Sequence, residues 1–282
     1  MKRMKRRKPR KRKRLVRHLP DKMIKTRVLT RSRALRRYIP ETLRMDRTSL
    51  NKMLEKWGMV YVKPVRGAMG RGVMRVERIE RKRGSAKKRF EYRVQIEKQK
   101  RRFGNYVRAY RAIRQAAGGE PYLAQRGIRL LTYRRRIFDI RVMVQRNPRG
   151  RWEVTGMAGR AAHPRKAVTN GSQGGTIYPV SDLLGANMGT KKRRSLTKAV
   201  RRIGLQAARQ MGRVYPGIQE IGADIALDRQ LRPWILEVNT RPDPCPFTKL
   251  PNRRMLRRIL YYGSRYGRHY KLNCTKSKPG RV

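Results

Sequence analysis

Two acidic residues and an amide stand close together in the segment from Gly222 to Pro242. Asp224 and Glu237 lie thirteen residues apart, Asn239 follows two residues later, and a polar turn separates the two apolar runs that contain the acids. This pattern predicts a β-hairpin in which Glu237 and Asn239 share a face and strand pairing brings Asp224 alongside them. Carboxylate and amide oxygens are ligands of Mg²⁺, which would take nucleotide phosphates as its remaining ligands. The alternative is a hairpin whose exposed acids align by chance.

A glycine-containing segment runs from Lys63 to Val73 between two predicted strands. Gly67, Gly70 and Gly72 allow backbone amides to approach phosphate oxygens without a Cβ in the way. The segment is neither a Walker A loop nor a dinucleotide fingerprint. Lys63 stands in an apolar strand, where an unpaired ammonium costs free energy, so a phosphate is its natural partner. The alternative is an ordinary hairpin loop.

A third group of polar residues lies on predicted strands in the second half of the chain. Asp139 and Arg141 share one face of a strand over residues 138–145, which fits either a binding site or a buried Asp–Arg pair. Arg160 ends the next predicted strand, and a loop rich in glycine begins at Asn170. Their order and spacing relative to the two acids is the informative feature.

The charge balance is strongly basic. The chain has 282 residues with 77 Lys and Arg against 17 Asp and Glu, a formal net charge of +60, and 38% apolar residues. The apolar content permits a folded core, but such a charge repels itself unless anions screen it. Nucleic acid, acidic polypeptide, polyphosphate and anionic surfaces are therefore the indicated partners. No recognition-helix motif, zinc finger or RNP-like aromatic pair is visible, so binding to nucleic acid would be non-specific.

The cysteine content indicates a reducing compartment. Cys245 and Cys274 are the only cysteines, they have no CxxC spacing, and the three histidines are scattered, so no zinc site is visible. No apolar run approaches membrane-spanning length, and the basic N-terminus is not followed by the apolar core of a signal peptide. We expect a cytoplasmic protein.

Apolar periodicity and turn residues predict an α+β fold with mostly antiparallel strands. The predicted helices cover residues 21–37, 48–57, 106–117, 192–215 and 255–262. The predicted strands before the hairpin cover residues 59–65, 73–79, 90–96, 122–125, 137–145 and 152–160. A basic arm (1–19) and a basic tail (266–282) flank these elements.

A series of short segments extends from about residue 20 to 250: DKMIKTRVL, YIPET, VYVKPVRGAMGRGV, YLAQRGIRL, FDIRVMVQ, GMAGR, TNGSQGG, GADIALD and ILEVNTRP. In this order they resemble the ATP-grasp superfamily, and more closely its YheC/YheD-type branch, which is associated with bacterial spore coats. The resemblance implies two α+β subdomains, over residues 20–121 and 122–265, that grip ATP between them.

The resemblance also implies roles for individual residues. Those expected to bind the nucleotide are the phosphate-binding Lys22 and Lys63, the covering-loop residues Gly67, Gly70 and Gly72, and the adenine hinge Gln125, Arg126, Gly127 and Ile128. Those expected to steady the γ-phosphate and an acyl phosphate are Arg141, Arg160 and Asn170. Those expected to bind Mg²⁺ are Asp224, Glu237 and Asn239, in agreement with the hairpin pattern.

The resulting hypothesis is a Mg²⁺- and ATP-dependent ligase that joins a carboxylate to an amine (or thiol) through an acyl phosphate, with a role in spore coat formation. Its partners would be the carboxylate substrate, the amine acceptor and an acidic polymer or polyanionic surface. The alternative is a non-catalytic polyanion-binding or spore-structural protein with a vestigial nucleotide site. The presence of all the expected lysines and acids favours the enzyme.

Overall fold

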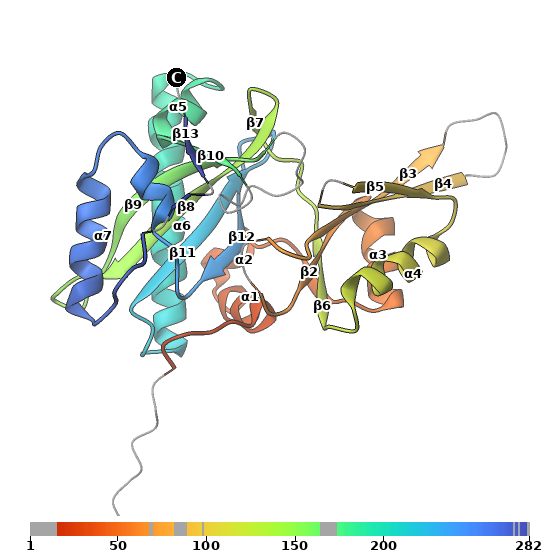
Figure 1. Cartoon of the computed structure of the whole chain (residues 1–282), viewed down its shortest axis with the longest axis horizontal. Helices are drawn as coiled ribbons and strands as arrows, with labels where there is room; N and C mark the ends of the chain where they lie inside the picture. The colour runs from red at the N-terminus through yellow and green to blue at the C-terminus, as the bar shows by residue number, and fades with distance from the viewer. Residues whose placement is uncertain are drawn as a thin grey trace, which may run out of the picture.

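The computed structural model describes residues 16–67, 70–81, 89–97, 99–163, 174–272, 274–275 and 277–280. The expectations for the first fifteen residues of the basic arm and for Asn170 fall outside this part of the chain. The fold is α+β, as predicted, and consists of two sheets that lie side by side with their helices (Figure 1).

The first sheet has six antiparallel strands in the order β1-β6-β2-β3-β4-β5. The strands are β1 (Thr42–Arg44), β2 (Met59–Pro64), β3 (Met74–Arg81), β4 (Arg89–Ile96), β5 (Gln99–Phe103) and β6 (Tyr122–Arg126). Helices α3 (Arg47–Trp57) and α4 (Tyr106–Ala117) cover one face of this sheet (Figure 1). An apolar core that includes Leu50, Val60 and Ile113 fills the space between helices and strands.

Capping residues set the ends of both helices. The Asp46 carboxylate accepts from the Ser49 amide while the Ser49 hydroxyl accepts from the Asp46 amide, which is a capping box at the start of α3. The Asn105 side chain caps α4 in the same manner. Gly58 and Gly118 end the two helices with φ values of 68° and 59°, a left-handed conformation that glycine adopts without a steric penalty.

The second sheet follows the order β12-β11-β8-β9-β10-β13, with β7 paired to β8. Its strands are β7 (Thr132–Tyr133), β8 (Arg136–Arg146), β9 (Trp152–Ala161), β10 (Thr176–Tyr178), β11 (Glu220–Leu227), β12 (Pro233–Asn239) and β13 (Lys278–Pro279). Its helices are α5 (Val180–Gly185), α6 (Thr190–Val214), the 3-10 helix η2 (Cys245–Lys249) and α7 (Arg254–Arg265).

Helices cover both faces of this second sheet. Val142 and Val144 of β8 pack in one core with Val200 of α6, whereas Met143 between them packs with Phe247 and Ile259 on the side of η2 and α7. Successive side chains of a strand point to opposite faces, so β8 is buried on both. This double cover explains why its sequence reads as a nearly continuous apolar run interrupted only by residues of the candidate site.

Helices α1 (Lys22–Thr30) and α2 (Arg33–Arg36) lie near the junction of the two sheets (Figure 1). They replace the single helix expected over 21–37. Val28 and Leu35 belong to the core of the second sheet, although the chain order puts them before the first. Strand β6 is hydrogen-bonded between β1 and β2, whereas the expected boundary between residues 121 and 122 assigns it to the second unit. Helices α1 and α2 therefore pack with the second sheet, and β6 pairs within the first sheet, so neither unit is one continuous stretch of the chain.

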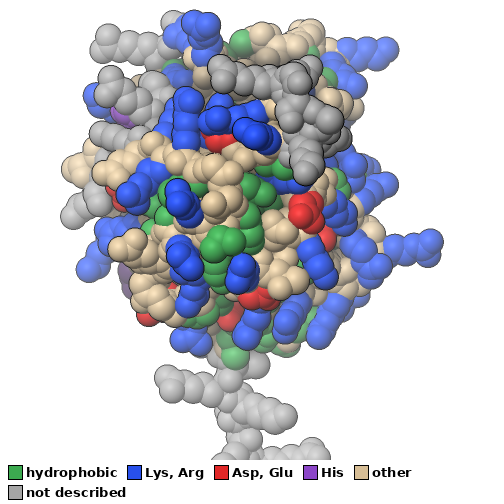
Figure 2. Space-filling model, turned by 90° about the vertical axis from the view of Figure 1, so that its right-hand side faces the viewer, with side chains coloured by type: hydrophobic (Ala, Val, Ile, Leu, Met, Phe, Trp, Pro, Cys, Tyr) green, Lys and Arg blue, Asp and Glu red, His purple; other side chains and the backbone are tan. Residues whose placement is uncertain are grey.

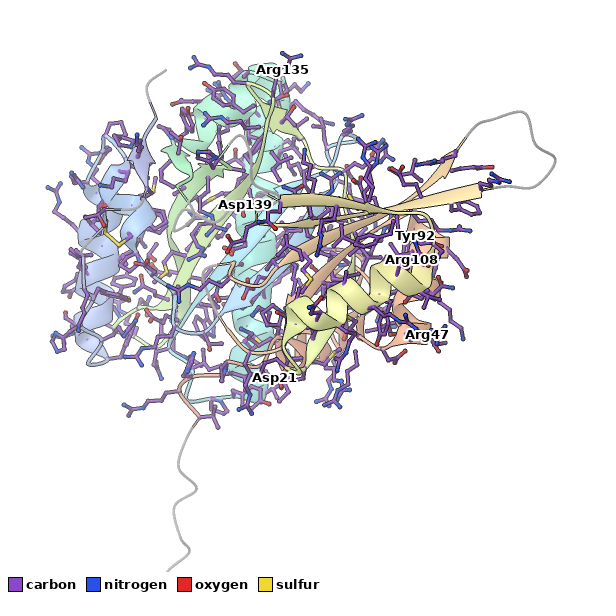
Figure 3. All side chains as sticks on the ribbon, turned by 45° about the vertical axis from the view of Figure 1, so that its right-hand side comes forward. Asp21, Arg47, Tyr92, Arg108, Arg135 and Asp139 are labelled. Atoms are coloured by element: carbon purple, nitrogen blue, oxygen red, sulfur yellow. A yellow bond between two sulfur atoms is a disulfide. The ribbon has the colours of Figure 1, made fainter. Side chains whose placement is uncertain are left out.

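Cys245 of η2 and Cys274 in the C-terminal segment form a disulfide across 29 residues of sequence. Figure 3 shows it at the side of α7. The disulfide does not fit the reducing compartment expected from the cysteine pattern, because disulfides persist mainly in oxidising surroundings.

Basic side chains are spread over the surface. Figure 2 shows Lys and Arg side chains around the face formed by the first sheet and its helices, with an apolar area in the middle and few acidic side chains between them. In the described part of the chain, no helix combines the length and the apolar character needed to cross a membrane.

Candidate functional site

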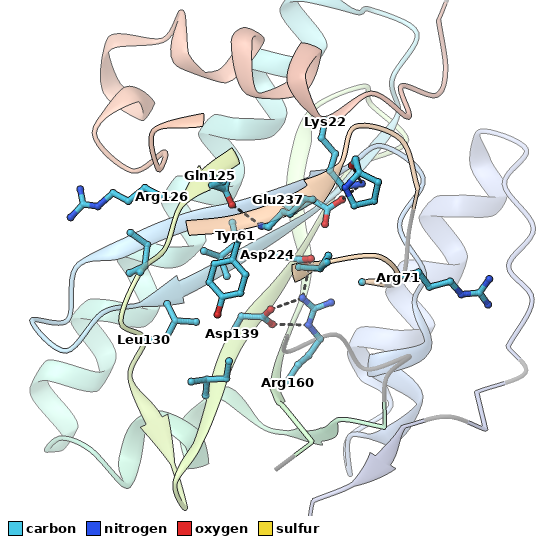
Figure 4. Close-up of a pocket in the computed structure, with 17 residues that line it drawn as sticks. Lys22, Tyr61, Arg71, Gln125, Arg126, Leu130, Asp139, Arg160, Asp224 and Glu237 are labelled. Atoms are coloured by element: carbon cyan, nitrogen blue, oxygen red, sulfur yellow. Dashed lines mark hydrogen bonds and ion pairs between the residues drawn. The ribbon is translucent and has the colours of Figure 1, made fainter. Parts of the chain in front are cut away.

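A pocket lies between the two sheets, where β2 and β6 of the first meet β8, β9, β11 and β12 of the second (Figure 4). Its charged lining residues include Lys22, Lys63, Arg160, Asp224 and Glu237. Its larger apolar or aromatic lining residues are Tyr61 of β2, Ile128 and Leu130 after β6, Ile137 of β8 and Leu236 of β12. A pocket with both charged and apolar lining suits a nucleotide, which has charged phosphates and an apolar base face.

The acidic hairpin is confirmed. Asp224 of β11 and Glu237 of β12 are direct partners in the antiparallel ladder, and Asn239 lies two residues further along β12, opposite Gly222. Directly opposed residues point to the same face, so the two carboxylates converge as the sequence predicts. Asn239 does not line the pocket.

Cross-strand ion pairs hold the centre of the site. Arg160 donates to both Asp139 oxygens, Nε to Oδ1 at 2.6 Å and Nη2 to Oδ2 at 2.7 Å, and Arg160 Nη2 lies 2.9 Å from Asp224 Oδ2. Arg141 also donates to Asp224, from Nε at 2.5 Å and Nη2 at 3.2 Å. Arg141 pairs with Asp224 across β8 and β11, so the pair on β8 alone, Asp139 with Arg141, is not the one that forms.

This network keeps Asp224 and Arg160 charged. Burial by itself would raise the pKa of Asp224, but Arg141 and Arg160 outweigh it and hold that pKa below its ordinary value. Burial would likewise lower the pKa of Arg160, but Asp139 and Asp224 outweigh it and raise that pKa. The result is a fixed guanidinium, 3% exposed, at the floor of the pocket.

Lys63 enters the pocket from β2. Its ammonium donates to Gln125 Oε1 at 2.6 Å, and the amide nitrogen of Gln125 donates to Thr42 Oγ1 at 3.1 Å, which fixes the amide orientation. Burial lowers the pKa of Lys63, and Glu237 offsets part of this effect. A lysine that is desolvated and hydrogen-bonded to a neutral amide is suited to an anionic ligand.

Lys22 holds the beginning of the glycine segment. Its ammonium donates to the carbonyls of Pro64 at 3.2 Å and Gly67 at 2.8 Å, and it lies 4.0 Å from Glu237 Oε1. Gly72 is required for the backbone rather than for a ligand: its φ is +68°, and an added Cβ would lie 2.7 Å from the Tyr122 hydroxyl oxygen. Of the three expected glycines, only Gly70 lines the pocket.

Part of the backbone of the expected adenine hinge is hydrogen-bonded to other segments of the protein. The backbone amides of Arg126 and Gly127 donate to the carbonyls of Glu41 and Met59, both at 2.8 Å. Those two amides are therefore engaged within the protein. The Arg126 side chain points out of the pocket in Figure 4, whereas Ile128 lines it.

The structure thus brings most of the expected residues together. Those that line the pocket are Lys22, Lys63, Gly70, Gln125, Arg126, Ile128, Arg160, Asp224 and Glu237. Those that do not are Gly67, Gly72, Gly127, Arg141 and Asn239. Arg141 still belongs to the site, because it fixes Asp224.

Sequence reasoning missed Tyr61 and Lys25. Tyr61 stands two residues before Lys63 and therefore on the same face of β2, a signal that period-2 alternation supplies. Lys25 follows Lys22 by one helical turn on α1, is 5% exposed, and lines a small cavity that Lys22, Lys63 and Glu237 also line. Burial lowers the pKa of Lys25.

The residues present fit a nucleotide triphosphate with a hard divalent cation. Glu237 is accessible and has Lys22 at 4.0 Å, and the neighbouring Asn239 supplies an amide oxygen on the same strand. Asp224 fits less fully, because three N–H groups already occupy most of the roughly four acceptor sites of a carboxylate. Among the described residues no group of three or more His, Cys, Asp or Glu could hold a metal ion, so phosphate oxygens would have to complete the shell.

Two curated relatives come from Bacillus subtilis (strain 168). The endospore coat-associated protein YheC is 27% identical over 227 residues, which cover 80% of this chain and 61% of that protein. The endospore coat-associated protein YheD is 24% identical over 198 residues, which cover 68% of this chain and 41% of that protein. The chain thus spans less than two thirds of the length of either relative.

Two solved structures are similar in chain path. The match to D-alanyl-alanine synthetase A from Vibrio cholerae has a TM-score of 0.44 at 13% identity. It covers 84% of this chain and 57% of the synthetase chain. The match to N5-carboxyaminoimidazole ribonucleotide synthetase from Thermotoga maritima has a TM-score of 0.45 at 12% identity. It covers 86% of this chain and 48% of the synthetase chain.

The family comparison extends over nearly the whole described chain. A model of the YheC/D-like ATP-grasp family matches residues 15–269, which contain every residue of the pocket and its ion-pair network. The chain therefore belongs to the YheC/D-like ATP-grasp family.

Proposed function

We propose that this protein is a Mg²⁺- and ATP-dependent ligase that activates a carboxylate as an acyl phosphate and transfers the acyl group to an amine or thiol. The observation that carries the proposal is the convergence of two lysines, a fixed arginine and two paired carboxylates in one pocket that also has apolar lining residues. A role in spore coat formation is part of the proposal and is supported by the names of the two curated relatives.

The lysines would bind phosphate oxygens. Lys63 is already desolvated, and a phosphate oxygen would add an opposite charge that the neutral amide of Gln125 does not supply. Lys22 donates two of its three N–H groups to loop carbonyls, so the third would bind a phosphate oxygen and tie the nucleotide to the glycine segment. The apolar lining residues, Tyr61 and Leu236 among them, would receive the base.

Glu237 and Asn239 would hold Mg²⁺, with Asp224 contributing its remaining acceptor site. The metal ion supplies charge neutralisation for the transferring phosphoryl group. Arg160, held by Asp139 and Asp224, offers a preorganised guanidinium for the negative charge that develops on the phosphoryl and acyl oxygens.

The covalent steps need no protein nucleophile. A substrate carboxylate oxygen bonds to the γ-phosphorus while the bond to the departing ADP breaks. The amine then bonds to the acyl carbon, the bond from that carbon to the phosphate oxygen breaks, and phosphate leaves with the proton that the amine loses. Binding both reactants beside Arg160 supplies proximity and orientation, and the surrounding sheets exclude water that would hydrolyse the acyl phosphate.

The test is the Glu237→Gln variant, which keeps the size of the side chain but removes a ligand charge. We expect ADP release, measured against pools of amino acids, acidic peptides and amines, to fall by about a hundredfold or more, the scale of losing a key electrostatic group. Calorimetry should also show that Mg²⁺ no longer tightens binding of a non-hydrolysable ATP analogue.

The matched control is Glu153→Gln, which removes a carboxylate on the outer side of β9 that pairs with Arg258. It should retain wild-type turnover. Wild-type turnover in Glu237→Gln, with circular dichroism unchanged in both variants, would contradict the metal assignment. Absence of ADP release from the wild-type protein with every substrate pool would contradict the ligase itself.

A further inference from the structure

A second and larger hollow lies on the other side of β6, the strand that leads into the expected adenine hinge, from the nucleotide pocket. It has a volume of about 650 Å³ and is formed by α1, α2, β1, the end of β6 and the turn before β12. We call it the arginine groove, because six arginines line it: Arg27, Arg36, Arg37, Arg44, Arg126 and Arg232.

The arginine groove has almost no balancing negative charge. None of its six guanidinium groups forms a salt bridge to a carboxylate in the described part of the chain. Its only acidic lining residue, Glu41, is already bonded to Lys56 at 2.8 Å and to the Trp57 ring nitrogen at 3.0 Å. Six cations of the described chain therefore line one hollow whose single carboxylate already has other partners.

Several of these arginines are held in place. The Arg126 guanidinium lies 3.7 Å from the ring centre of Trp57, and Arg232 lies 4.5 Å from that of Trp234. Arg36 donates to the Thr30 carbonyl and Arg232 to the Arg37 carbonyl. Cation–π stacking and single backbone bonds leave the other N–H groups of each fork free for a ligand.

One side of the arginine groove is also a strand edge. β1 is the outermost strand of the first sheet and pairs only with β6, and residues 41–44 line the groove. The Arg126 amide bonds to the Glu41 carbonyl and the Met45 amide bonds to the Tyr122 carbonyl, so the two residues that flank β1 turn these backbone groups to β6. Alternate residues of an antiparallel strand face the same neighbour, so Thr42 and Arg44 turn their backbone groups to the other edge, where the Arg44 carbonyl already accepts from the Ser49 hydroxyl.

We propose that the arginine groove binds an acidic polypeptide segment in an extended conformation, with its carboxylates on the arginines and its main chain along the edge of β1. Arginine forks match carboxylates, and addition of a strand to an open edge is a common mode of peptide binding. The inference goes beyond the proposed ligase activity and does not depend on it.

A polypeptide fits the groove better than a single-stranded nucleic acid does. Nucleic-acid grooves of this kind offer free aromatic rings on which bases stack. The one aromatic ring that lines this groove, Trp234, is 4% exposed and is covered by Arg126 and Arg232. A strand edge also supplies main-chain hydrogen bonds, which a nucleic acid cannot use in this pattern.

The experiment compares two triple variants with the same change in net charge. Arg27→Gln/Arg37→Gln/Arg44→Gln removes three exposed cations of the groove. Arg108→Gln/Arg111→Gln/Arg114→Gln removes three exposed cations from α4, none of which lines the groove (Figure 3). Fluorescence anisotropy measures binding of labelled decaglutamate and of a labelled oligothymidylate of equal charge at about 0.1 M salt.

We expect the groove variant to bind decaglutamate roughly tenfold more weakly or worse, because each exposed ion pair contributes about twofold to fivefold in affinity. The α4 variant should stay within about twofold of the wild type, and the oligothymidylate should respond similarly to both variants. Equal loss of decaglutamate binding in both triple variants, or a loss in the groove variant confined to the oligothymidylate, overturns the proposal.

Folding is checked in the same experiment. All three groove positions are exposed, and such surface substitutions usually change stability little. If the triple variant nevertheless unfolds, the single variants Arg37→Gln and Arg44→Gln replace it. Each should lose about twofold to fivefold in decaglutamate affinity, and wild-type affinity in both overturns the proposal.

Discussion

The buried arginine of the site allows a sharp test of the structure. Arg160→Met keeps most of the side-chain volume but removes the guanidinium that donates to both Asp139 oxygens and lies 2.9 Å from Asp224. Asp139 is 1% exposed and Asp224 is 6% exposed, so neither carboxylate can turn to solvent without local opening. The variant buries negative charge that has lost its main counter-charge.

Breaking a buried ion pair by removing one partner costs about 3–5 kcal/mol. For a protein of this size such a loss lowers the melting temperature by about 10 °C. Asp139→Asn in the Arg160→Met background removes one of the two buried carboxylates that Arg160 contacts and should recover part of the loss, because a buried neutral amide is less costly than a carboxylate.

The loss should also depend on pH. Arg141 and Arg160 hold the pKa of Asp224 below its ordinary value of 3.8, so this carboxylate stabilises the fold above that pH and ceases to do so as the pH falls through the lowered pKa. Arg160→Met removes one of the two guanidinium groups and raises the pKa of Asp224. The difference in unfolding free energy between wild type and variant should therefore be greatest near pH 7 and should shrink below about pH 4.

Urea denaturation at several pH values measures these differences, with Arg258→Met as the matched control. Arg258 also pairs with a glutamate, Glu153, but the two side chains are 44% and 32% exposed, and exposed pairs contribute about 0–1 kcal/mol. If Arg160→Met unfolds within about 1 kcal/mol of the wild type, as Arg258→Met should, then the buried network does not hold the site together.

Two further predictions concern Lys63 and the disulfide. Lys63→Met should weaken ATP binding measured by calorimetry, while apo stability should hold or rise because relief of desolvation offsets the lost bond to Gln125, which is worth about 1–3 kcal/mol. Unchanged ATP affinity in Lys63→Met would remove Lys63 from the site. Because burial lowers the pKa of Lys63 from 10.5, the unfolding free energy of the wild-type apo protein should rise as the pH increases toward 10.5, and that of Lys63→Met should rise less steeply. Cys274→Ala should lower the unfolding free energy by about 3.6 kcal/mol, the chain-entropy value for a loop of this length, and treatment with a reductant should lower it by as much in the wild type but not in the variant.

Local sequence patterns were sufficient for most secondary structure. The helix over Tyr106–Ala117 was predicted with the bounds that the structure gives, because its apolar spacing is regular and Gly118 ends it. The acidic hairpin was predictable for a similar reason: alternation along a strand and a polar turn are short-range signals. Short edge strands such as β1 and β5 were missed, because few apolar residues mark them.

The sequence by itself therefore determined which residue types stand on which face of each element, including the convergence of Asp224 and Glu237. Only the tertiary structure decided the pairings: Arg141 with Asp224, Arg160 with Asp139, and Lys22 with the carbonyls of the glycine segment. Periodicity describes one element at a time, whereas these contacts depend on strand order and register across the sheets. In a chain with 77 basic residues, the sequence offers each acid many alternative partners, and only burial in a particular register selects among them.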